Sequence, residues 1–260
     1  MNSRMRTTFF ATCALIVTGA WTVPALAQAA EVSEKPPMYT YVSDWVFPRA
    51  QWTEIEKSRG GTTKVFEKAL SGSSLIGYGD DLTLVHQPDG STHDTWWSSM
   101  SMAGLLNVLD EIHKAGGATT PALNSATKHW DEVFVSRFYN WRAGSYTGAY
   151  THTSSYKLKA DAPDDAMESL SKSFIVPMME KLLADGTIVE YEIDQQAVHT
   201  QAPGMFLIVY ISQNAGGVDK VNAALQQSLK TNPFAGPAFG SMIDFAEHRD
   251  ELARTNATYK

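Results

Sequence analysis

The sequence predicts an α+β protein built from two tandem copies of a βαββαβ unit. Two observations support this prediction: one stretch of sequence occurs twice at a constant offset, and the order of strand-like and helix-like segments repeats with it. The stretch from Met178 to Ile211 matches the one that begins at Val65, at an offset of 113 residues. The matched pairs are Glu67/Glu180, Lys68/Lys181, Leu70/Leu183, Tyr78/Tyr191, Asp81/Asp194, Val85/Val198 and His86/His199. Tyrosine and histidine matches at a single offset, each copy followed by a Pro/Gly turn, indicate internal duplication.

The first unit is expected over residues 39–142, after a polar, proline-containing stretch at 28–38 that we expect to be a flexible leader. Strands are predicted at 39–47, 75–87, 92–102 and 133–141, where β-branched and aromatic residues concentrate. The spacing of apolar residues predicts helical turns near 52–55 and 64–70 and a helix at 105–112, with a loop at 115–127. The resulting order is strand, helix, strand, strand, helix, strand.

The second unit, over residues 143–260, repeats this order. Strands are predicted at 146–158, 188–194, 205–211 and 241–245, with helices at 162–185 and 218–229 and a short closing helix at 246–254. Pro163 suits the first turn of the long helix, and Pro177 is expected to kink it. The strand at 188–194 alternates, with Val189, Tyr191 and Ile193 on one face and Glu190, Glu192 and Asp194 on the other.

Residues 1–27 have the features of a signal peptide. Arg4 and Arg6 give a basic start, the following segment is apolar, and Ala25-Leu26-Ala27 has the form of a cleavage site. The alternative is an uncleaved anchor helix, although the apolar run is short for a membrane span. We therefore expect a periplasmic or secreted protein that is not inserted in the membrane after cleavage.

Composition excludes several kinds of chemistry in the cleaved protein. Cys13 lies within the signal peptide, so disulfides, thiolate metal sites and cysteine nucleophiles are excluded after cleavage. Loss of Arg4 and Arg6 takes the net charge from −7 to −9, which disfavours nucleic acid as a partner. The sequence also contains no nucleophile elbow, no H-E-x-x-H, no P-loop and no dinucleotide fingerprint.

The order βαββαβ is that of the ferredoxin-like unit, whose antiparallel sheet has both helices on one face. Two units packed sheet to sheet would cover the other faces, an arrangement that resembles the dimeric α/β barrel superfamily as a pseudo-dimer in one chain. The resemblance covers roughly Tyr39 to Arg249. It implies a class that includes cofactor-free monooxygenases, stress-response proteins and haem enzymes with two fused units, but no member's catalytic motif maps onto this chain. The stretch HRDELARTNATYK is also similar to an uncharacterised exported bacterial family.

The duplicated side chains are the first candidates for a site. If Tyr78, His86, Tyr191 and His199 line a central cavity, the histidines could transfer protons, hold a metal or ligate haem. The alternative is that each histidine lies at the end of a hairpin and hydrogen-bonds the turn. His86 could also face His93 across the hairpin, but this pair is more typical of a solvated hairpin end than of a metal site, and no metal is expected.

Aromatic and polar residues of the strands are the second group of candidates. The aromatic residues are Trp96, Trp97, Phe138, Tyr139, Trp141, Tyr146, Tyr150 and Tyr156. They form either the walls of a ligand pocket or a filled core. Arg137, His152 and Asp244 are polar residues that could lie inside. Arg137 and Asp244 occupy similar places on the predicted fourth strands, and a buried pair of this kind is more often structural than catalytic.

Two functions follow from these candidates. The first is an exported protein that binds a small apolar or aromatic ligand between its two sheets, near Tyr78, Tyr191, Trp97, Tyr139 and His152. The second is an oxidative enzyme that is cofactor-free or haem-dependent and uses His86, His199 or Arg137. The expected cofactor is none, with haem as the alternative. The expected assembly is a monomer or homodimer.

Overall fold

The chain is described by a computed structural model that covers residues 32–58, 62–232 and 235–260. The expected signal peptide lies outside these residues. Residues 32–260 belong to one compact unit. The described part of the expected leader is hydrogen-bonded to the barrel, because Lys35 N donates to Arg137 O at 2.8 Å and Tyr139 donates its hydroxyl to Pro36 O at 2.8 Å. None of the helices in the described residues has the length and apolarity needed to cross a membrane.

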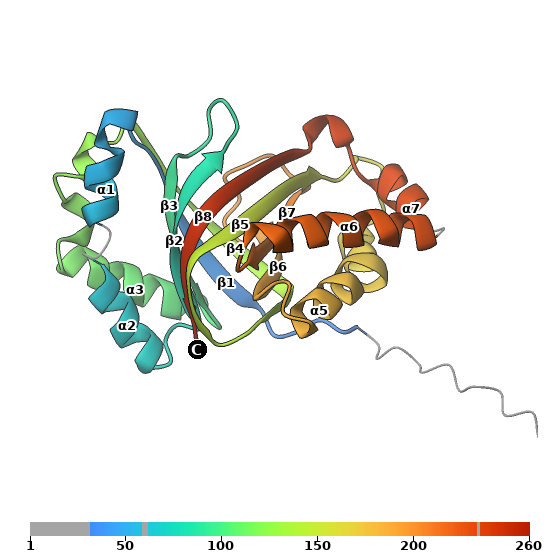
Figure 1. Cartoon of the computed structure of the whole chain (residues 1–260), viewed down its shortest axis with the longest axis horizontal. Coiled ribbons are helices and arrows are strands. Elements are labelled where there is room, and N and C mark those ends of the chain that lie inside the picture. Colours follow the sequence, from blue (N-terminus) through green and yellow to red (C-terminus); the bar gives the residue numbers. More distant parts are fainter. Residues whose placement is uncertain (1–31, 59–61, 233–234) are drawn as a thin grey trace, which may run out of the picture. The chain divides into compact units, whose positions relative to one another are not determined.

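Eight antiparallel strands close into a barrel in the order β1-β3-β2-β8-β5-β7-β6-β4 (Figure 1). The strands are β1 (Met38–Val46), β2 (Gly77–Val85), β3 (His93–Ser99), β4 (Lys128–Trp141), β5 (Gly144–Lys157), β6 (Glu190–Gln196), β7 (Met205–Ser212) and β8 (Arg249–Tyr259). Each half of the chain contributes four of them, with its fourth strand beside its first and its first beside its third. This is the strand order of the expected βαββαβ unit, so the predicted α+β class and barrel are confirmed.

The two halves are joined through their edges. Strand β2 pairs with β8, and β4 pairs with β6, so each half completes the sheet of the other. The two four-stranded sheets of the expected barrel are therefore joined at their edges by hydrogen bonds, in addition to facing one another. Closure gives every edge strand a hydrogen-bonding partner, which face-to-face packing would not do.

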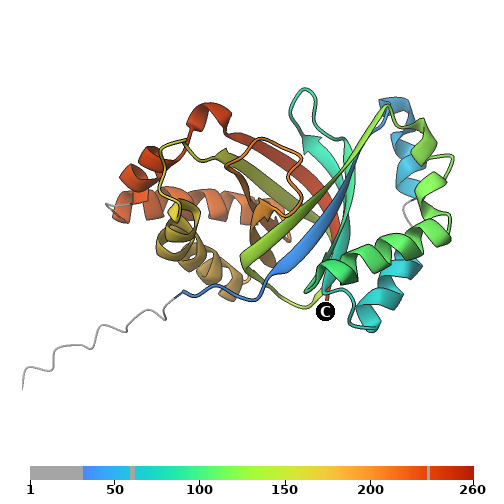
Figure 2. The same cartoon turned by 180° about the vertical axis from the view of Figure 1, so that it is seen from behind.

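Helices cover the outside of the barrel on two opposite sides (Figures 1 and 2). The first half contributes η1 (Arg49–Gln51), α1 (Trp52–Ser58), α2 (Thr63–Ser71), α3 (Met102–Lys114), η3 (Gly117–Thr119) and η4 (Leu123–Ser125). The second half contributes α4 (Ala166–Leu170), η5 (Ser171–Ile175), α5 (Val176–Ala184), α6 (Ala215–Thr231), α7 (Ala235–Met242) and η6 (Phe245–Glu247). The π-helical turn η5 directly precedes Pro177, so the expected helix irregularity lies where proline removes a backbone donor.

The duplication is visible in the way that the third strand of each half leads into the next helix. Ser99 donates its hydroxyl to Ser74 O at 2.7 Å, and Ser212, 113 residues later, donates to Thr187 O at 3.1 Å. A Cβ atom on Gly104 would lie 2.2 Å from the Ser99 hydroxyl, and one on Gly217 would lie 1.8 Å from that of Ser212. Only glycine permits this close approach of helix and strand. The offset found in the sequence is therefore that of a shared local structure.

The last strand differs from its prediction. We expected a strand at 241–245 and a closing helix at 246–254, whereas α7 ends at Met242 and β8 occupies Arg249–Tyr259. Residues Glu251 to Arg254 favour a helix by intrinsic propensity. Small residues at Ala253, Thr255 and Ala257 alternate into the barrel, and the pairing of β8 with both β2 and β5 outweighs that propensity.

Candidate functional site

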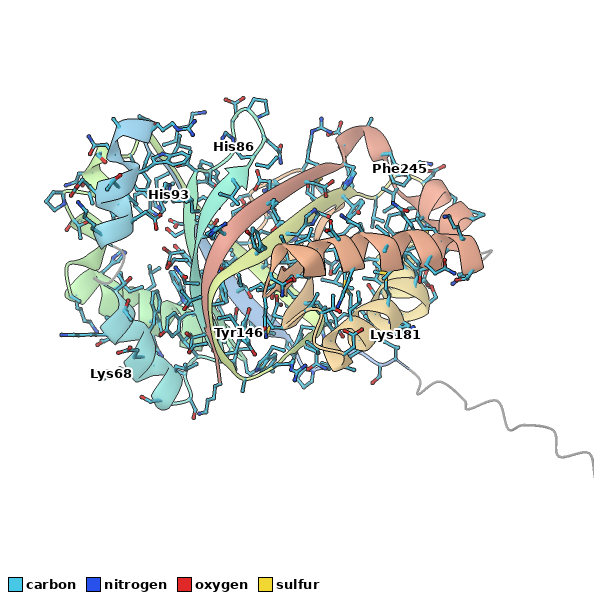
Figure 3. The ribbon with its side chains drawn as sticks, viewed as in Figure 1. Lys68, His86, His93, Tyr146, Lys181 and Phe245 are labelled. Atoms are coloured by element: carbon cyan, nitrogen blue, oxygen red, sulfur yellow. The ribbon has the colours of Figure 1, made fainter. Side chains whose placement is uncertain are left out.

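A cavity of about 570 Å³ lies in the first half of the chain, between the helix layer and the outer face of the sheet. Its floor is formed by β1, β3 and β4, and its sides by α1, α2, α3 and the loop that carries η3 and η4. Figure 3 shows His93 on the side of the sheet that faces α1. Strand alternation explains which side chains reach the cavity, because Tyr41, Ser43 and Trp45 share the outer face of β1.

Aromatic side chains form most of the cavity wall. The lining aromatic residues are Tyr41, Trp45, Phe47, Phe66 and Trp97. The rings of Tyr41 and Trp97 are stacked with centroids 4.3 Å apart, and Trp45 stacks on the imidazole of His129 at 3.8 Å. Such flat, rigid surfaces are suited to stacking against a planar ligand.

A row of polar groups crosses the floor of the same cavity. His129 Nε2 lies 3.0 Å from the hydroxyl of Ser43 and 3.1 Å from a carboxylate oxygen of Asp131. Burial, followed by the nearby charge of Asp131 and a hydrogen bond to it, raises the pKa of Tyr41. Tyr41 therefore stays a neutral donor to Asp131, and the row can offer both donors and acceptors to a ligand. Both contacts of His129 are on one nitrogen, so this is not a nucleophile–base–orienter triad.

The cavity does not fit haem. His93 is the most deeply buried imidazole there, but its Nδ1 lies 3.0 Å from the Thr92 hydroxyl and its Nε2 lies 3.4 Å from a carboxylate oxygen of Glu56. The described residues that line the cavity include no lysine or arginine to pair with propionates. A haem-ligating role is therefore not supported by the geometry of this site.

The duplicated tyrosines lie outside the barrel interior, under the two helix layers. Tyr78 stacks on Phe66 at 5.1 Å beside the N-terminal helices. Tyr191 is 1% exposed and donates its hydroxyl to Glu180 of α5 at 2.6 Å. We expected both residues to line a cavity between the sheets, and neither of them does. Trp97, in contrast, does line a cavity, although it is the one outside the sheet.

The proposed catalytic side chains do not converge. His86 is exposed in the loop after β2, with Nδ1 2.6 Å from Gln87 O, and Figure 3 shows it in a loop away from the barrel. His199 is exposed in the loop after β6. Arg137 is exposed at an irregularity of β4 and lies 3.5 Å from Glu34. The expected central cluster of these residues is absent from the described chain.

The remaining candidates occupy other places. Tyr139 is buried and its hydroxyl is bound to Pro36 O. His152 stacks on Tyr210 on the outer face of β5 and lies 3.9 Å from Asp250. Burial, opposed by the charge of Asp250, lowers the pKa of His152. Arg137 and Asp244 do not occupy equivalent places on the fourth strands as expected, because Asp244 precedes η6 and accepts from Ala246 N.

The hairpin between β2 and β3 is wider than expected. His93 pairs with Leu82 rather than with His86, so the two histidines are not opposite each other. The signal for the actual cavity was present in the sequence, as alternation over Tyr41, Ser43 and Trp45, but it could not show which face of the strand carried the site.

The space inside the barrel has a different character from the one predicted. Its lining carries many carboxylate side chains, among them Asp81, Glu190, Glu192 and Asp194. This lining disfavours an apolar ligand between the sheets. The aromatic-lined cavity lies instead under the helices of the first half.

Comparison with solved structures identifies the architecture. A protein named "putative monooxygenase" from Lactobacillus acidophilus matches with a TM-score of 0.60 and 10% identity, over 86% of this chain and 97% of that one. A "putative monooxygenase" from Fusobacterium nucleatum matches with a TM-score of 0.60 and 9% identity, over 87% and 95%. This chain has the dimeric α/β barrel fold. At about 10% sequence identity, similarity to these structures establishes the fold and not the function. No family model matches the sequence, and no curated protein matches it.

Proposed function

We propose that the dimeric α/β barrel described here binds a small, flat aromatic molecule in the cavity of its first half. The observation that supports this most strongly is the cavity of about 570 Å³, whose lining combines aromatic rings with a row of polar groups. Its volume is in the range of small-molecule sites, and such sites combine apolar walls with a few placed polar groups.

The chemistry of the lining narrows the class of ligand. Asp131 is acidic, and the described lining has no basic side chain other than its histidines, so a neutral ligand is favoured over an anionic one. A hydroxyl on an aromatic ring could donate to Asp131 or accept from Ser43 while the ring stacks against Trp45. A phenol or naphthol is therefore the preferred class.

Isothermal titration with 2-naphthol tests this proposal. Ser43→Phe places a ring in the cavity and removes one polar contact, so its affinity is expected to fall at least about tenfold, equal to about 1.4 kcal/mol. Thr147→Phe makes the same kind of change on an exposed position of β5 and is the matched control. Equal affinities in both variants would show that the cavity is not the binding site.

A second candidate function is cofactor-free oxidation of the aromatic ligand. It is favoured by the Asp131–His129 contact, which gives a base beside the ligand site, and by the monooxygenase names of two proteins with this fold. Oxygen uptake with 1,4-dihydroxynaphthalene, above the uncatalysed rate and lost in His129→Ala, would support it. An uptake rate equal in wild type and His129→Ala would leave binding as the function.

Export is part of the proposal. It rests on the basic start, apolar segment and cleavage signal of residues 1–27. Expression of the full chain in a bacterium, followed by N-terminal sequencing of the periplasmic fraction, is expected to give a chain that begins at Gln28. Recovery of the full-length chain in the membrane fraction would favour the anchor alternative.

A further inference from the structure

Acidic side chains from both halves of the chain converge inside the barrel. The inner cavity, of about 120 Å³, is lined by Asp44, Asp81, Asp94, Glu132, Glu190, Glu192, Asp194 and Glu251. They come from β1, β2, β3, β4, β6 and β8. Among the described residues that line this space there is no lysine, arginine or histidine. The cluster thus lacks an internal positive charge within the described part of the chain.

The strand register brings several of these acids together. Asp94 of β3 lies directly opposite Asp44 of β1 on one side and Asp81 of β2 on the other. On the opposite part of the barrel, Glu190, Glu192 and Asp194 share the inner face of β6. Like charges in directly opposed positions destabilise a sheet, so a core of this composition is unfavourable unless something offsets it.

Two buried polar atoms in the same lining are without a hydrogen-bond partner. Thr151 is 7% exposed and Asp194 is 2% exposed. Within the described residues, the hydroxyl of Thr151 has no hydrogen-bond partner, and Asp194, although its carboxyl group is hydrogen-bonded to Glu192, has none at its Oδ1 atom. Buried polar groups in folded proteins are nearly always hydrogen-bonded, so these two atoms are free to accept hydrogen bonds from a group that enters the cavity.

We propose that the interior of the barrel binds an aliphatic ammonium ion, with Asp194 and Glu190 as its main charge partners. Glu190 and Asp194 are four residues apart on β6, a span of about 13 Å along the strand, and Glu192 between them hydrogen-bonds Asp194. Consistent with this, no group of three His, Cys, Asp or Glu side chains in the described chain is arranged to hold a metal ion. A short diamine can follow the spaced carboxylates, with its methylenes against Trp96 and Val209.

A wider cavity adjoins this site. A second cavity, of about 490 Å³, shares Asp44, Glu132 and Glu251 with the inner one. Acidic side chains therefore extend from the wider space to the inner carboxylates, which favours a cation over an anion there, although Arg249 also lines the wider space.

Binding of an ammonium ion should be linked to the release of protons from the buried acids. Burial, then the charges of Glu192, Asp194 and Asp81, raises the pKa of Glu190 well above its ordinary value. Burial and the charge of Glu192 likewise raise the pKa of Asp194. An ammonium ion favours the ionised forms of these acids, so binding is expected to release protons and to strengthen as the pH rises from 6 to 8.

The test is isothermal titration with 1,5-diaminopentane, repeated in two buffers of different ionisation enthalpy. The Asp194→Asn/Glu190→Gln pair is expected to weaken binding at least tenfold and to abolish the proton release. The Asp161→Asn/Asp164→Asn pair changes the net charge equally at exposed positions and should leave both unchanged. Thr151→Val preserves side-chain size and removes the unpartnered hydroxyl, so it should weaken binding severalfold without loss of folding.

Three outcomes would overturn the proposal: no heat of binding in the wild type at millimolar diamine, equal loss of affinity in the two double variants, or displacement of the diamine by equimolar calcium. The inference is independent of the aromatic-ligand site. Ser43→Phe should leave diamine binding unchanged, and the Asp194→Asn/Glu190→Gln pair should leave 2-naphthol binding unchanged.

Discussion

The two halves of the barrel share a strand order and a local strand–helix structure, but they differ in how their helices meet the sheet. In the C-terminal half, the space beneath α5, α6 and α7 is filled by a large apolar cluster that includes Phe174, Tyr191 and Phe239. In the N-terminal half, a smaller cluster around Phe66 and Trp97 leaves a cavity of about 570 Å³. Duplication therefore preserves the scaffold, whereas the side chains between helix and sheet determine which half has room for a ligand.

Replacing a large apolar side chain with alanine should show the largest difference in stability between the two halves. Phe174 is buried against Phe239, with ring centroids 5.9 Å apart, so Phe174→Ala is expected to lower the free energy of unfolding by about 3–5 kcal/mol. Leu109 already lines the open cavity, so Leu109→Ala should cost only about 1 kcal/mol. Urea unfolding of both variants measures the difference. Equal losses would mean that the N-terminal half is as tightly filled as the C-terminal one.

The acids inside the barrel belong to both halves. Because of them, we expect the free energy of unfolding to fall as the pH rises. Burial raises the pKa of Glu192 to about 7 and is likewise the main cause that raises the pKa of Asp44 to about 7. The native state therefore binds protons more tightly than the unfolded state. The resulting stabilisation is complete below the ordinary pKa of these acids and is lost as the pH rises through 7.

Urea unfolding at pH 6.5 and 8 measures this effect. Each pKa unit corresponds to about 1.4 kcal/mol, so the free energy of unfolding should fall by on the order of 1 kcal/mol or more over this interval. Glu192→Gln should flatten the dependence, while Glu247→Gln, at an exposed acid, should not. His152, whose pKa is lowered, acts in the opposite direction, mainly below pH 7. A flat profile in the wild type would contradict the description of the interior.

Removing the hydroxyl groups of the duplicated tyrosines should give a smaller difference in stability between the two halves. Tyr191→Phe removes the hydrogen bond to Glu180 in a closed core and should cost about 1 kcal/mol. Tyr78 is half-buried and contributes mainly through its ring, which stacks on Phe66, so Tyr78→Phe should be within about 0.5 kcal/mol of wild type. Thermal or urea unfolding measures both. A larger cost for Tyr78→Phe would show that the two tyrosines kept equivalent roles.

The duplicated histidines should give the smallest effect. His86 and His199 are exposed in loops, so replacing either with alanine should change the free energy of unfolding by less than about 0.5 kcal/mol. Neither change should affect 2-naphthol binding. A loss of affinity in either variant would restore the role first predicted for them.

Sequence reasoning found the architecture because apolar periodicity and the offset of 113 residues are local patterns. It identified the equivalent strands correctly, since Tyr78 and Tyr191 both lie under helices and Asp81 and Asp194 both lie inside the barrel. It did not find the sites, because alternation separates two faces of a strand without showing which one meets a helix layer. The duplicated tyrosines and histidines, which we expected inside the barrel, lie outside it. The duplicated acids Asp81 and Asp194 line its interior instead.

The position of the ligand tests the central claim most directly. The indole N–H signals of Trp45 and Trp97 report on the helix-covered cavity, whereas those of Trp96 and Trp141 report on the interior side of the barrel. In a titration of the ¹⁵N-labelled protein with 2-naphthol followed by NMR, shifts confined to Trp45 and Trp97 are the predicted result. Shifts of Trp96 or Trp141 with no change at Trp45 and Trp97 would place the ligand inside the barrel and contradict the account.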